Sequence, residues 1–365
     1  MSKEDVLLTA DNCRYCLMCR HVCPVGHVTA LETLTPHGWG LLIASQRRGL
    51  LDWNEDSVSK LYSCADCGTC RAHCVTDQPL PHAIAVARAQ VVEQGLAPPI
   101  IYEVQQMLET WETPFVQTSP ERVRGRGEVA LFVGDEARYL WPETLDAALT
   151  LLDAVGIEPV LIGAGRNNGY IPSSLGLPAT ARKLALANLA DLESSGARHL
   201  LTLTPGDFFT FSKLYPERLG VSLPDTITLT EVIPLLAQRL IAEEIGFRPM
   251  PPGPPYAYVD PAHSVRIAPR YDTPRQLLSA IMPESAVELF WRRERTHPAG
   301  NTSLQFGNPQ FADHLTWARL GDARQVGAQR IITEDPGTLH ALSKHAPRFG
   351  LQIEGLYELL AAQLN

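Results

Sequence analysis

Two cysteine quartets of identical spacing constrain this chain more than any other feature. They are Cys13-x-x-Cys16-x-x-Cys19-x-x-x-Cys23 and Cys64-x-x-Cys67-x-x-Cys70-x-x-x-Cys74, and they contain all 8 cysteines of the sequence. Runs with this spacing hold [4Fe–4S] clusters, and where two runs occur the fourth cysteine of each ligates the cluster of the other. The spacing therefore predicts two [4Fe–4S] clusters with exchanged ligands.

The exchange predicts which cysteines share a cluster. The two ligand sets are Cys13, Cys16, Cys19 and Cys74 for the first cluster, and Cys64, Cys67, Cys70 and Cys23 for the second. Zinc and disulfide bonds are the alternatives. Structural zinc sites usually take their ligands as two separated pairs, and disulfide frameworks belong to short secreted chains. The quartets therefore favour iron–sulfur clusters over both.

The composition favours a reducing compartment and protein partners. The chain has 365 residues and 45% hydrophobic content, enough for two or three cores. Its formal charge of −9 argues against a nucleic-acid partner, because phosphate binding needs a basic face. No stretch approaches the ~18 consecutive apolar residues that a membrane span requires, and no cysteine is left over for a disulfide. We therefore expect a cytoplasmic protein, or one that is peripheral at the inner membrane face.

Two loop-like segments divide the chain. Residues 113–127 combine prolines and glycines with several arginines, and residues 249–255 are mostly proline. Such segments interrupt any helical or strand pattern. They predict three domains, over residues 1–118, 128–248 and 256–365.

The first domain is predicted to be helical between its cysteine turns. Residues 84–94 are strong helix formers that end at Gly95, and residues 100–111 carry apolar residues at helical spacing. The domain contains 8 Lys and Arg against 13 Asp and Glu, a formal charge of −5 before any cluster adds its own negative charge. A partner that docks on it should present a positive face.

The other two domains look like copies of one α/β unit. Residues 196–206 reappear as residues 327–337, and each copy reads as a strand that ends in a Thr-x-x-Pro-Gly turn. The other predicted strands are 129–133, 159–162, 256–259 and 286–290, and the helices between them are 143–155 and 273–281. This alternation predicts parallel sheets covered by helices, with active residues in loops at the carboxyl ends of the strands.

The whole chain resembles a family of iron–sulfur subunits that includes the D-type subunit of heterodisulfide reductase, the glycolate oxidase iron–sulfur subunit and the C-type subunit of anaerobic glycerol-3-phosphate dehydrogenase. Beyond the cysteines, the resemblance rests on Glu-Thr-Leu-Thr-Pro-His-Gly at 32–38, Tyr-Ser-Cys-Ala-Asp-Cys-Gly at 62–68 and Asp-Pro-Ala-His at 260–263. It implies an α-helical two-cluster ferredoxin domain followed by two tandem Rossmann-like α/β repeats of the cysteine-rich CCG type.

The two repeats depart from that family because their cysteines are gone. Residues 167–169 (Asn-Asn-Gly) and 298–300 (Pro-Ala-Gly) stand where the family has Cys-Cys-Gly, and residues 204–207 and 335–338 replace its paired cysteines around a proline. Ala262 stands where an Asp-Pro-Cys-His signature would have its thiol. Without these thiolates, the extra cluster and the disulfide chemistry implied by intact repeats cannot be carried over.

Two functions follow from these expectations. In the first, the chain is a non-catalytic electron-transfer subunit that relays electrons between a partner flavoprotein, by resemblance a FAD-linked hydroxyacid dehydrogenase, and a further redox partner. In the alternative, it is a catalytic subunit whose altered repeats hold a substrate or a metal at Asp207, His263, His297 and Asp335. Capping of turns and helices explains these four residues better, and no other catalytic motif is evident, so the first function is favoured.

Overall fold

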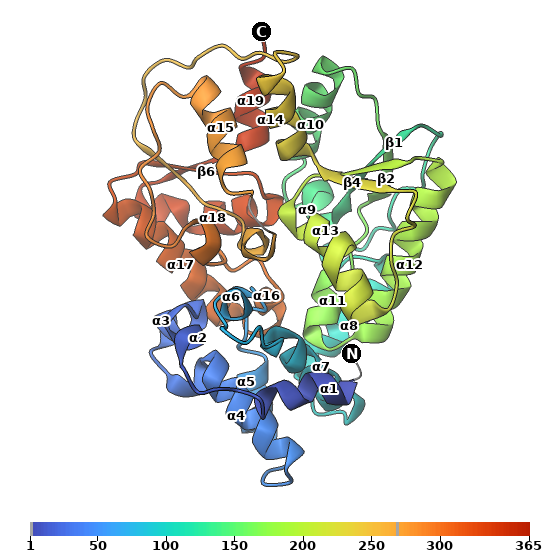
Figure 1. Ribbon diagram of the computed structural model, residues 1–365, viewed down its shortest axis with the longest axis vertical. Helices are drawn as coiled ribbons and strands as arrows, with labels where there is room; N and C mark the ends of the chain where they lie inside the picture. The colour runs from blue at the N-terminus through green and yellow to red at the C-terminus, as the bar shows by residue number, and fades with distance from the viewer. Residues whose placement is uncertain (1–2, 268–269) are drawn as a thin grey trace.

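The computed structural model describes residues 3–267 and 270–365, and its first part is a set of packed helices (Figure 1). These helices are α1 (Lys3–Leu7), α2 (Met18–His21), α3 (Pro24–Thr29), α4 (Pro36–Arg47), α5 (Glu55–Leu61), α6 (Thr69–Ala72), α7 (Leu80–Glu93) and α8 (Pro99–Trp111), with 3-10 turns η1 (Leu8–Ala10) and η2 (Glu32–Leu34). The helices predicted at 84–94 and 100–111 are confirmed as parts of α7 and α8. The helical character of the cysteine-bearing part is therefore as predicted.

Side-chain caps fix where the helices between the two cysteine motifs begin. The Thr35 side chain accepts a hydrogen bond from Gly38 N at the start of α4, where Pro36 is the first helical residue. At α5, the Asn54 side chain accepts from Ser57 N, and the Ser57 side chain accepts from Asn54 N in return. Such caps satisfy amide groups that the first helical turn leaves without partners. They hold the first and second motifs at opposite ends of a short helical connection.

The second part contains a four-stranded parallel sheet. Its elements are β1 (Val129–Val133), α9 (Gly134–Tyr139), α10 (Glu143–Ala154), β2 (Val160–Ala164), α11 (Tyr170–Leu175), α12 (Pro178–Ser195), β3 (His199–Thr202), α13 (Pro205–Phe209), the π-helical segment η3 (Thr210–Leu219), β4 (Thr228–Glu231) and α14 (Val232–Ile241). The strand order is β2-β1-β3-β4, with Ala130 opposite Val160 and Leu200. Both faces of the central strand are buried, which explains its continuous apolar run. The sequence did not reveal β4.

The third part contains a three-stranded parallel sheet in the order β5-β6-β7. Its elements are β5 (Tyr256–Tyr258), η4 (Ala262–Arg266), α15 (Asp272–Ile281), η5 (Arg293–Arg295), α16 (Leu304–Gly307), α17 (Pro309–Gln325), β6 (Arg330–Thr333), α18 (Pro336–Phe349), β7 (Gln352–Gly355) and α19 (Leu356–Ala362). Parallel pairing and alternating helices confirm the predicted α/β character of both parts. The predicted helices at 143–155 and 273–281 are confirmed as α10 and α15.

The predicted strand at 286–290 is wrong. The segment lies beside β5, because Val287 N donates to Tyr256 O at 2.8 Å, but it forms no strand. The side chain of Glu288 is drawn to Arg275, with an Nε to Oε1 distance of 2.9 Å, and Phe290 is 62% exposed. The segment therefore buries Leu289 in the core without pairing as a strand, while Glu288 between the two apolar residues forms an ion pair.

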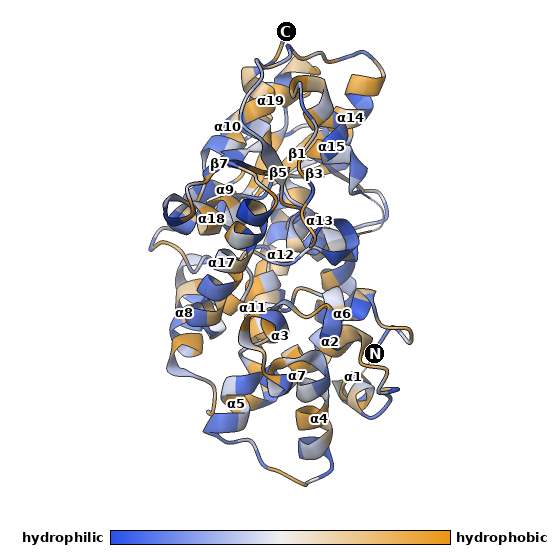
Figure 2. Ribbon diagram, turned by 90° about the vertical axis from the view of Figure 1, so that its left-hand side faces the viewer, coloured by the Kyte–Doolittle hydropathy of each residue, from blue (hydrophilic) through white to orange (hydrophobic). Residues whose placement is uncertain are grey.

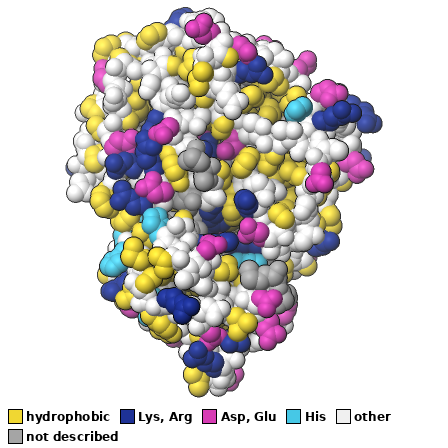
Figure 3. Space-filling view, in the orientation of Figure 1, with side chains coloured by type: hydrophobic (Ala, Val, Ile, Leu, Met, Phe, Trp, Pro, Cys, Tyr) yellow, Lys and Arg dark blue, Asp and Glu magenta, His cyan; other side chains and the backbone are white. Residues whose placement is uncertain are grey.

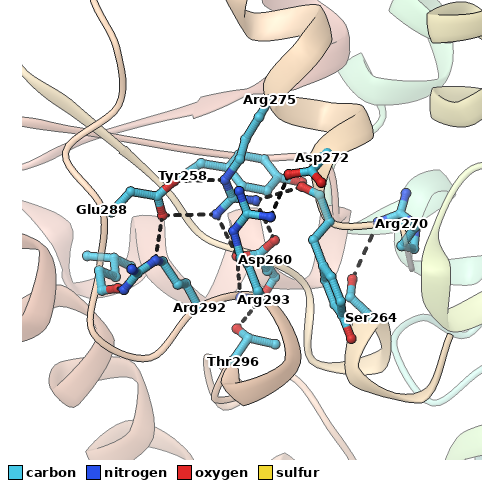
Figure 4. Close-up of polar contacts among 12 residues, drawn as sticks. Tyr258, Asp260, Ser264, Arg270, Asp272, Arg275, Glu288, Arg292, Arg293 and Thr296 are labelled. Atoms are coloured by element: carbon cyan, nitrogen blue, oxygen red, sulfur yellow. Dashed lines mark hydrogen bonds and ion pairs between the residues drawn. The ribbon is translucent and has the colours of Figure 1, made fainter. Parts of the chain in front are cut away.

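Asp260 holds the loops that follow β5 (Figure 4). Its carboxylate accepts hydrogen bonds from the two terminal nitrogens of Arg275, at 2.8 and 3.0 Å, and from Arg293 N at 2.9 Å. Its carbonyl oxygen accepts from Thr296 Oγ1 at 2.7 Å. The aspartate of the Asp-Pro-Ala-His match is thus a structural anchor with a bidentate arginine, a geometry favoured for carboxylates.

The two sheet-containing parts repeat each other residue by residue around one turn. β3 and β6 differ by 131 positions, and so do the proline residues that begin α13 and α18. Gly169 and Gly300, also 131 apart, have φ angles of 97° and 92°. A Cβ added at Gly169 would approach Ala181 O, and one added at Gly300 would approach Ala312 O, again 131 positions apart. The same close approach of backbone to helix is therefore used twice, and only glycine tolerates it.

The two sheets share one apolar core, and the last helix of each part packs on the other part. Helix α19 packs on α10, and α14 packs on α15, so all four lie together at the end of the molecule that carries the C-terminus (Figure 1). Between the sheets, Leu131 and Val133 of β1 join the same buried cluster as Tyr258 of β5. The opposite face of the first sheet, including Phe132, shares a second cluster with the cysteine-bearing helices. Buried apolar surface thus links all three parts.

Hydrophobic and hydrophilic residues alternate along the helices (Figure 2). Among the helices within residues 3–267 and 270–365, none is both long and apolar enough to cross a membrane.

Candidate metal centres

The first three cysteines of the first motif lie on the loop before α2 and in α2 itself, and they meet the end of the second motif. A cavity there is lined by Cys13, Cys16, Cys19, Cys74 and Cys70. The thiols that interact electrostatically with Cys19 are those of Cys13, Cys74 and Cys16. Cys74, although it belongs to the second motif, is therefore a neighbour of the first.

Cys23 lies away from the rest of its own motif. It is the N-cap of α3, it is buried, and the thiols that interact with it are those of Cys67 and Cys64. Cys70 interacts with Cys67, Cys64 and Cys23, and more weakly with Cys19. The structure thus brings Cys64, Cys67, Cys70 and Cys23 together. The two groups of cysteines lie next to each other at Cys19 and Cys70.

The two cysteine turns have the same backbone conformation. Tyr15 and Asp66, each two residues after the first cysteine of a motif, have φ angles of 53° and 47°. Leu17 and Gly68, each one residue after the second cysteine, have φ angles of 61° and 82°. Tyr15 N donates to Cys13 Sγ at 3.4 Å, and Asp66 N donates to Cys64 Sγ at 3.3 Å. Left-handed residues of this kind turn successive amides toward an anion, as in many iron–sulfur sites.

The donor set fits iron–sulfur clusters. All eight cysteines are free thiols, and backbone N–H groups also point at the sulfurs of Cys23 and Cys74, each at 3.4 Å. Such hydrogen bonds favour the thiolate form that binds iron. Within the part of the chain that the structure describes, no three His, Cys, Asp or Glu side chains are placed so that they could hold a single metal ion.

The second group of cysteines is more buried than the first. Cys23, Cys64 and Cys67 are at most 7% exposed, whereas Cys16 is exposed. Burial raises the pKa of the Cys64 thiol to about 12 and the pKa of Cys23 well above its ordinary value. These thiols are therefore protonated without iron, and iron binding must release their protons.

A buried carboxylate between two cysteines fixes the second turn to the sheet-containing parts. Asp66 is 2% exposed and accepts hydrogen bonds from both Arg218 of the second part, at 3.0 and 3.2 Å, and Arg266 of the third, at 3.3 Å. Burial alone would raise the pKa of Asp66, but the two guanidinium groups lower it to about 2. Tyr170 Oη also donates to Asp66 O at 3.0 Å. We call the contact of Asp66 with Arg218 and Arg266 the Asp66 clamp, and it was not predicted from the sequence.

Arg88 of α7 also holds the second cysteine turn through hydrogen bonds. Its Nη2 donates to Leu61 O at 2.6 Å and to Cys64 O at 2.7 Å, and its Nη1 donates to Ser174 O at 2.8 Å. The side chain is almost completely buried. An arginine in the otherwise apolar stretch 83–89 was the signal in the sequence that could have revealed this role.

Three of the four candidate residues in the altered repeats meet where the two sheets face each other. Asp207, His263 and Asp335 line one small cavity together with Asp135 and Glu136, in the segments that follow the carboxyl ends of the strands. The fourth candidate, His297, does not line it. Its ring stacks on Trp291 at 4.1 Å.

Most polar groups of this cavity have structural partners. Asp335 caps α18 by accepting from Thr338 N, and Asp207 accepts from Asn168 Nδ2 and Thr204 Oγ1, each at 2.8 Å. Burial raises the pKa of Asp207 to about 7 and that of Asp135 to about 6. These carboxyl groups are therefore partly protonated near neutral pH.

Comparison with known proteins places the cysteine-bearing helices in a class. Residues 9–84 match the family of 4Fe-4S dicluster domains, and this segment contains both cysteine quartets. The chain therefore carries an iron–sulfur domain of the dicluster class.

Relatives of known description match most of the chain at low identity. The D-type subunit of dihydromethanophenazine:CoB--CoM heterodisulfide reductase from Methanosarcina barkeri is 23% identical over 332 residues, covering 85% of this chain and 80% of that protein. The "Probable iron-sulfur-binding oxidoreductase FadF" of Bacillus subtilis is 23% identical over 316 residues, covering 77% of this chain and 43% of FadF. The predicted resemblance to this heterodisulfide reductase protein is confirmed.

A solved structure shares the fold. The crystal structure of a hypothetical protein from Helicobacter pylori matches 100% of this chain and 76% of its own, with a TM-score of 0.59 and 10% sequence identity.

Proposed function

We propose that this chain is the electron-transfer subunit of a multi-subunit oxidoreductase and holds two [4Fe–4S] clusters. The first is held by Cys13, Cys16, Cys19 and Cys74, and the second by Cys64, Cys67, Cys70 and Cys23. When bound, each cluster supplies one-electron redox chemistry. The protein itself holds the clusters, sets how much water reaches them and provides the surface on which partners dock.

The observation that carries this proposal is the grouping of the cysteines. Each group takes three cysteines from one motif and the last cysteine from the other, and Cys19 and Cys70 adjoin. One group lies near the surface and the other lies under the sheet-containing parts. Two adjacent clusters at different depths form a path for electrons from the surface to the interior.

The surface around the first group suits a redox partner. Tyr15, Met18 and Val75 are 54%, 47% and 73% exposed, although all three are apolar or aromatic and lie next to cluster cysteines. The cysteine-bearing part is also acidic. We propose that a FAD-containing dehydrogenase with a basic rim docks here, as charge complementarity favours, and that a further redox partner completes the chain of transfer. The relatives described as an oxidoreductase and as part of a reductase support this role.

We further propose that the sheet-containing parts are CCG-type repeats that have lost their thiols. The shared offset of 131 residues, the paired glycines Gly169 and Gly300 and the facing strand ends support this. The corresponding units are residues 1–118, 128–248 and 256–365, and the protein acts in the cytoplasm or at the inner face of a membrane. The altered repeats then serve as a scaffold that buries the second cluster.

The cluster content gives the direct test. Because the cysteines form two complete ligand sets, protein purified without oxygen should contain about eight iron and eight acid-labile sulfide per chain. Iron, sulfide and zinc are measured together, and the spectra of the reduced protein should be those of two interacting [4Fe–4S] centres. Bound zinc in place of iron, or about four iron per chain, would contradict the assignment.

A catalytic role is the second candidate because Asp207, His263 and Asp335 share one cavity. Such a cluster of titratable groups is a common feature of active sites. In that case one of these side chains would contact substrate, and its replacement would abolish turnover while the iron content stayed unchanged.

The variant Asp207→Asn separates the two functions. The pKa of Asp207 in the folded protein lies above its ordinary value, so the stabilisation present below about pH 4 is lost as the pH rises through about 7. The neutral amide removes this penalty, so the variant should be more stable than the parent by ~1–3 kcal/mol at pH 8 and by a clearly smaller margin at pH 5, where only the lower part of the range between the two pKa values has been crossed. Thermal unfolding at both pH values measures this. Electron transfer from the partner should be unchanged, and its loss at normal iron content would favour the catalytic role.

A further inference from the structure

A cavity of ≈ 300 Å³ opens beside the second cysteine turn, where the three parts of the molecule meet. Gly68, Arg71 and His82 come from the cysteine-bearing helices, Lys213 and Arg218 from the second part, and Arg266 from the third. The molecular surface is hollowed near the middle of the view in Figure 3, where Lys and Arg side chains lie in the hollow and Asp, Glu and His side chains lie around it. Junctions between domains are common sites for small ligands, and this volume is at the lower end of their range.

Cationic groups dominate the lining of this junction cavity. Arg218 and Arg266 are 9% and 8% exposed at their side chains and share the single carboxylate of Asp66. Two buried guanidinium groups on one carboxylate leave an excess positive charge. Lys213 is exposed, and among the described residues it has no ion-pair partner. Arg71 is paired with Asp77 and Glu217 at the rim.

His82 lines the cavity together with several of these cationic groups. The pKa of its imidazole is lowered to about 3, mainly by burial and in addition by Arg218 and Arg71, against the opposite effect of Asp66. The imidazole is therefore neutral, and the net potential of the charged side chains around it is positive. A ligand in this position would be attracted by its negative charge.

The same cavity has an apolar wall. Pro79, Pro81, Phe209 and Leu214 contribute to the lining, and the Arg266 guanidinium lies 4.6 Å from the centre of the Phe209 ring. Planar guanidinium groups bind carboxylates through paired N–H donors, and each has five such donors. Arg218 and Arg266 use only part of theirs on the protein.

From these features we propose that the junction cavity binds a small organic carboxylate next to the second cluster. The negative group lies against Arg218, Arg266 and Lys213, and the carbon skeleton lies against Phe209 and Leu214. The proposal rests on the proposed function, because the second cluster gives the site its redox role. The ligand acts by binding alone and undergoes no reaction.

Arg266 connects the ligand to the cluster. Its Nε donates to Cys67 O at 3.0 Å, and its guanidinium lies against Gly68, where an added Cβ would come within 2.1 Å of Nε. An anion bound here adds negative charge near the cluster and makes the reduced state less favourable. By linkage, the ligand then binds the oxidised protein more tightly than the reduced one, and by the same factor.

The experiment uses the cluster-loaded full chain and succinate as the probe, with inorganic phosphate for comparison. Saturable binding of succinate is measured by calorimetry without oxygen, first on the oxidised and then on the dithionite-reduced protein. We expect succinate to bind the oxidised form more tightly, by about tenfold, which corresponds to a potential of the second cluster lowered by about 59 mV. Redox titration followed by magnetic resonance measures that shift directly.

The variant Lys213→Gln tests the site, and Lys344→Gln is its control. Both lysines are exposed, so both variants should fold, but Lys344 lies on α18 outside the junction cavity. Succinate affinity should fall about fivefold in Lys213→Gln, as expected for one exposed charge-assisted contact, and stay unchanged in the control. Equal effects of the two variants, phosphate binding as tight as succinate, or no saturable binding to protein with full iron content would overturn the inference. Absence of iron would instead contradict the proposed function.

Discussion

Replacing Cys23 with serine should alter the same cluster as replacing Cys70, although the two residues belong to different motifs. Cys23 is near Cys64 and Cys67 rather than near the cysteines of its own run. Serine keeps the cap of α3, because its hydroxyl can accept from Gly26 N as the sulfur does. The change therefore removes a thiolate ligand while preserving the local fold.

Cys74→Ser and Cys13→Ser form the matched pair for the other cluster. Each of the four variants should lose or convert one cluster, so that iron falls from about eight toward about four per chain. Magnetic resonance of the reduced proteins shows which centre is affected. If Cys23→Ser instead altered the same signal as Cys13→Ser, each motif would hold its own cluster and the exchanged assignment would be wrong.

Removing the charge of Asp66 should destabilise the whole molecule. The variant Asp66→Asn leaves Arg218 and Arg266 buried beside each other without their shared carboxylate. Breaking a buried pair from one side typically costs about 3–5 kcal/mol, because the remaining charge is left uncompensated. We expect a loss of that order, together with faster loss of the second cluster, since its turn is held through this carboxylate.

Asp77→Asn is the matched control. Asp77 pairs with Arg71 in the same part of the chain, but both side chains are largely exposed, at 73% and 38%. Exposed pairs contribute at most about 1 kcal/mol. Denaturant unfolding of the cluster-loaded proteins, followed by circular dichroism and by cluster absorbance, measures both variants. A change in Asp66→Asn as small as that in Asp77→Asn would show that the clamp contributes little.

The Asp66 clamp also gives the two sheet-containing parts a way to affect the second cysteine turn. Through Arg218 and Arg266, both sheet-containing parts contact the turn that carries Cys64 and Cys67. A sheet-containing part without cysteines can therefore influence a cluster held by this turn, by excluding water from it and by placing positive charge near it. Both effects change reduction potentials.

The local sequence determined the elements whose signals are short-range. The apolar run at β1 and the glycine-ended pattern of α7 follow from side-chain periodicity and helix-ending residues. The repeat around residues 196–206 and 327–337 was visible for the same reason, since it is a local turn used twice. The cysteine spacing likewise predicted the dicluster class, because a cubane requires several thiolates on one short turn.

Elements that depend on distant partners could not be predicted from the local sequence. The strands β4 and β7 are short and only partly buried, so their pairing with β3 and β6 decides them. The segment 286–290 has an apolar pattern, yet it lies beside β5 without joining the sheet, and its Glu288 forms an ion pair with Arg275 of α15. The contacts of Asp66 with Arg218 and Arg266 join residues 152 and 200 positions apart, and no local pattern records such a pairing.

The sequence by itself determined the dicluster class of the cysteine-bearing domain, because the match depends on residue type and spacing. It also indicated that Asp207, His263 and Asp335 would lie near strand ends. Only the tertiary structure decided that these three meet in one cavity while His297 packs elsewhere, that the second cysteine group is buried, and that a cationic cavity lies beside it. Burial and charge at these places arise from segments brought together by the shared apolar cores, so their physical cause exists only once the chain has folded.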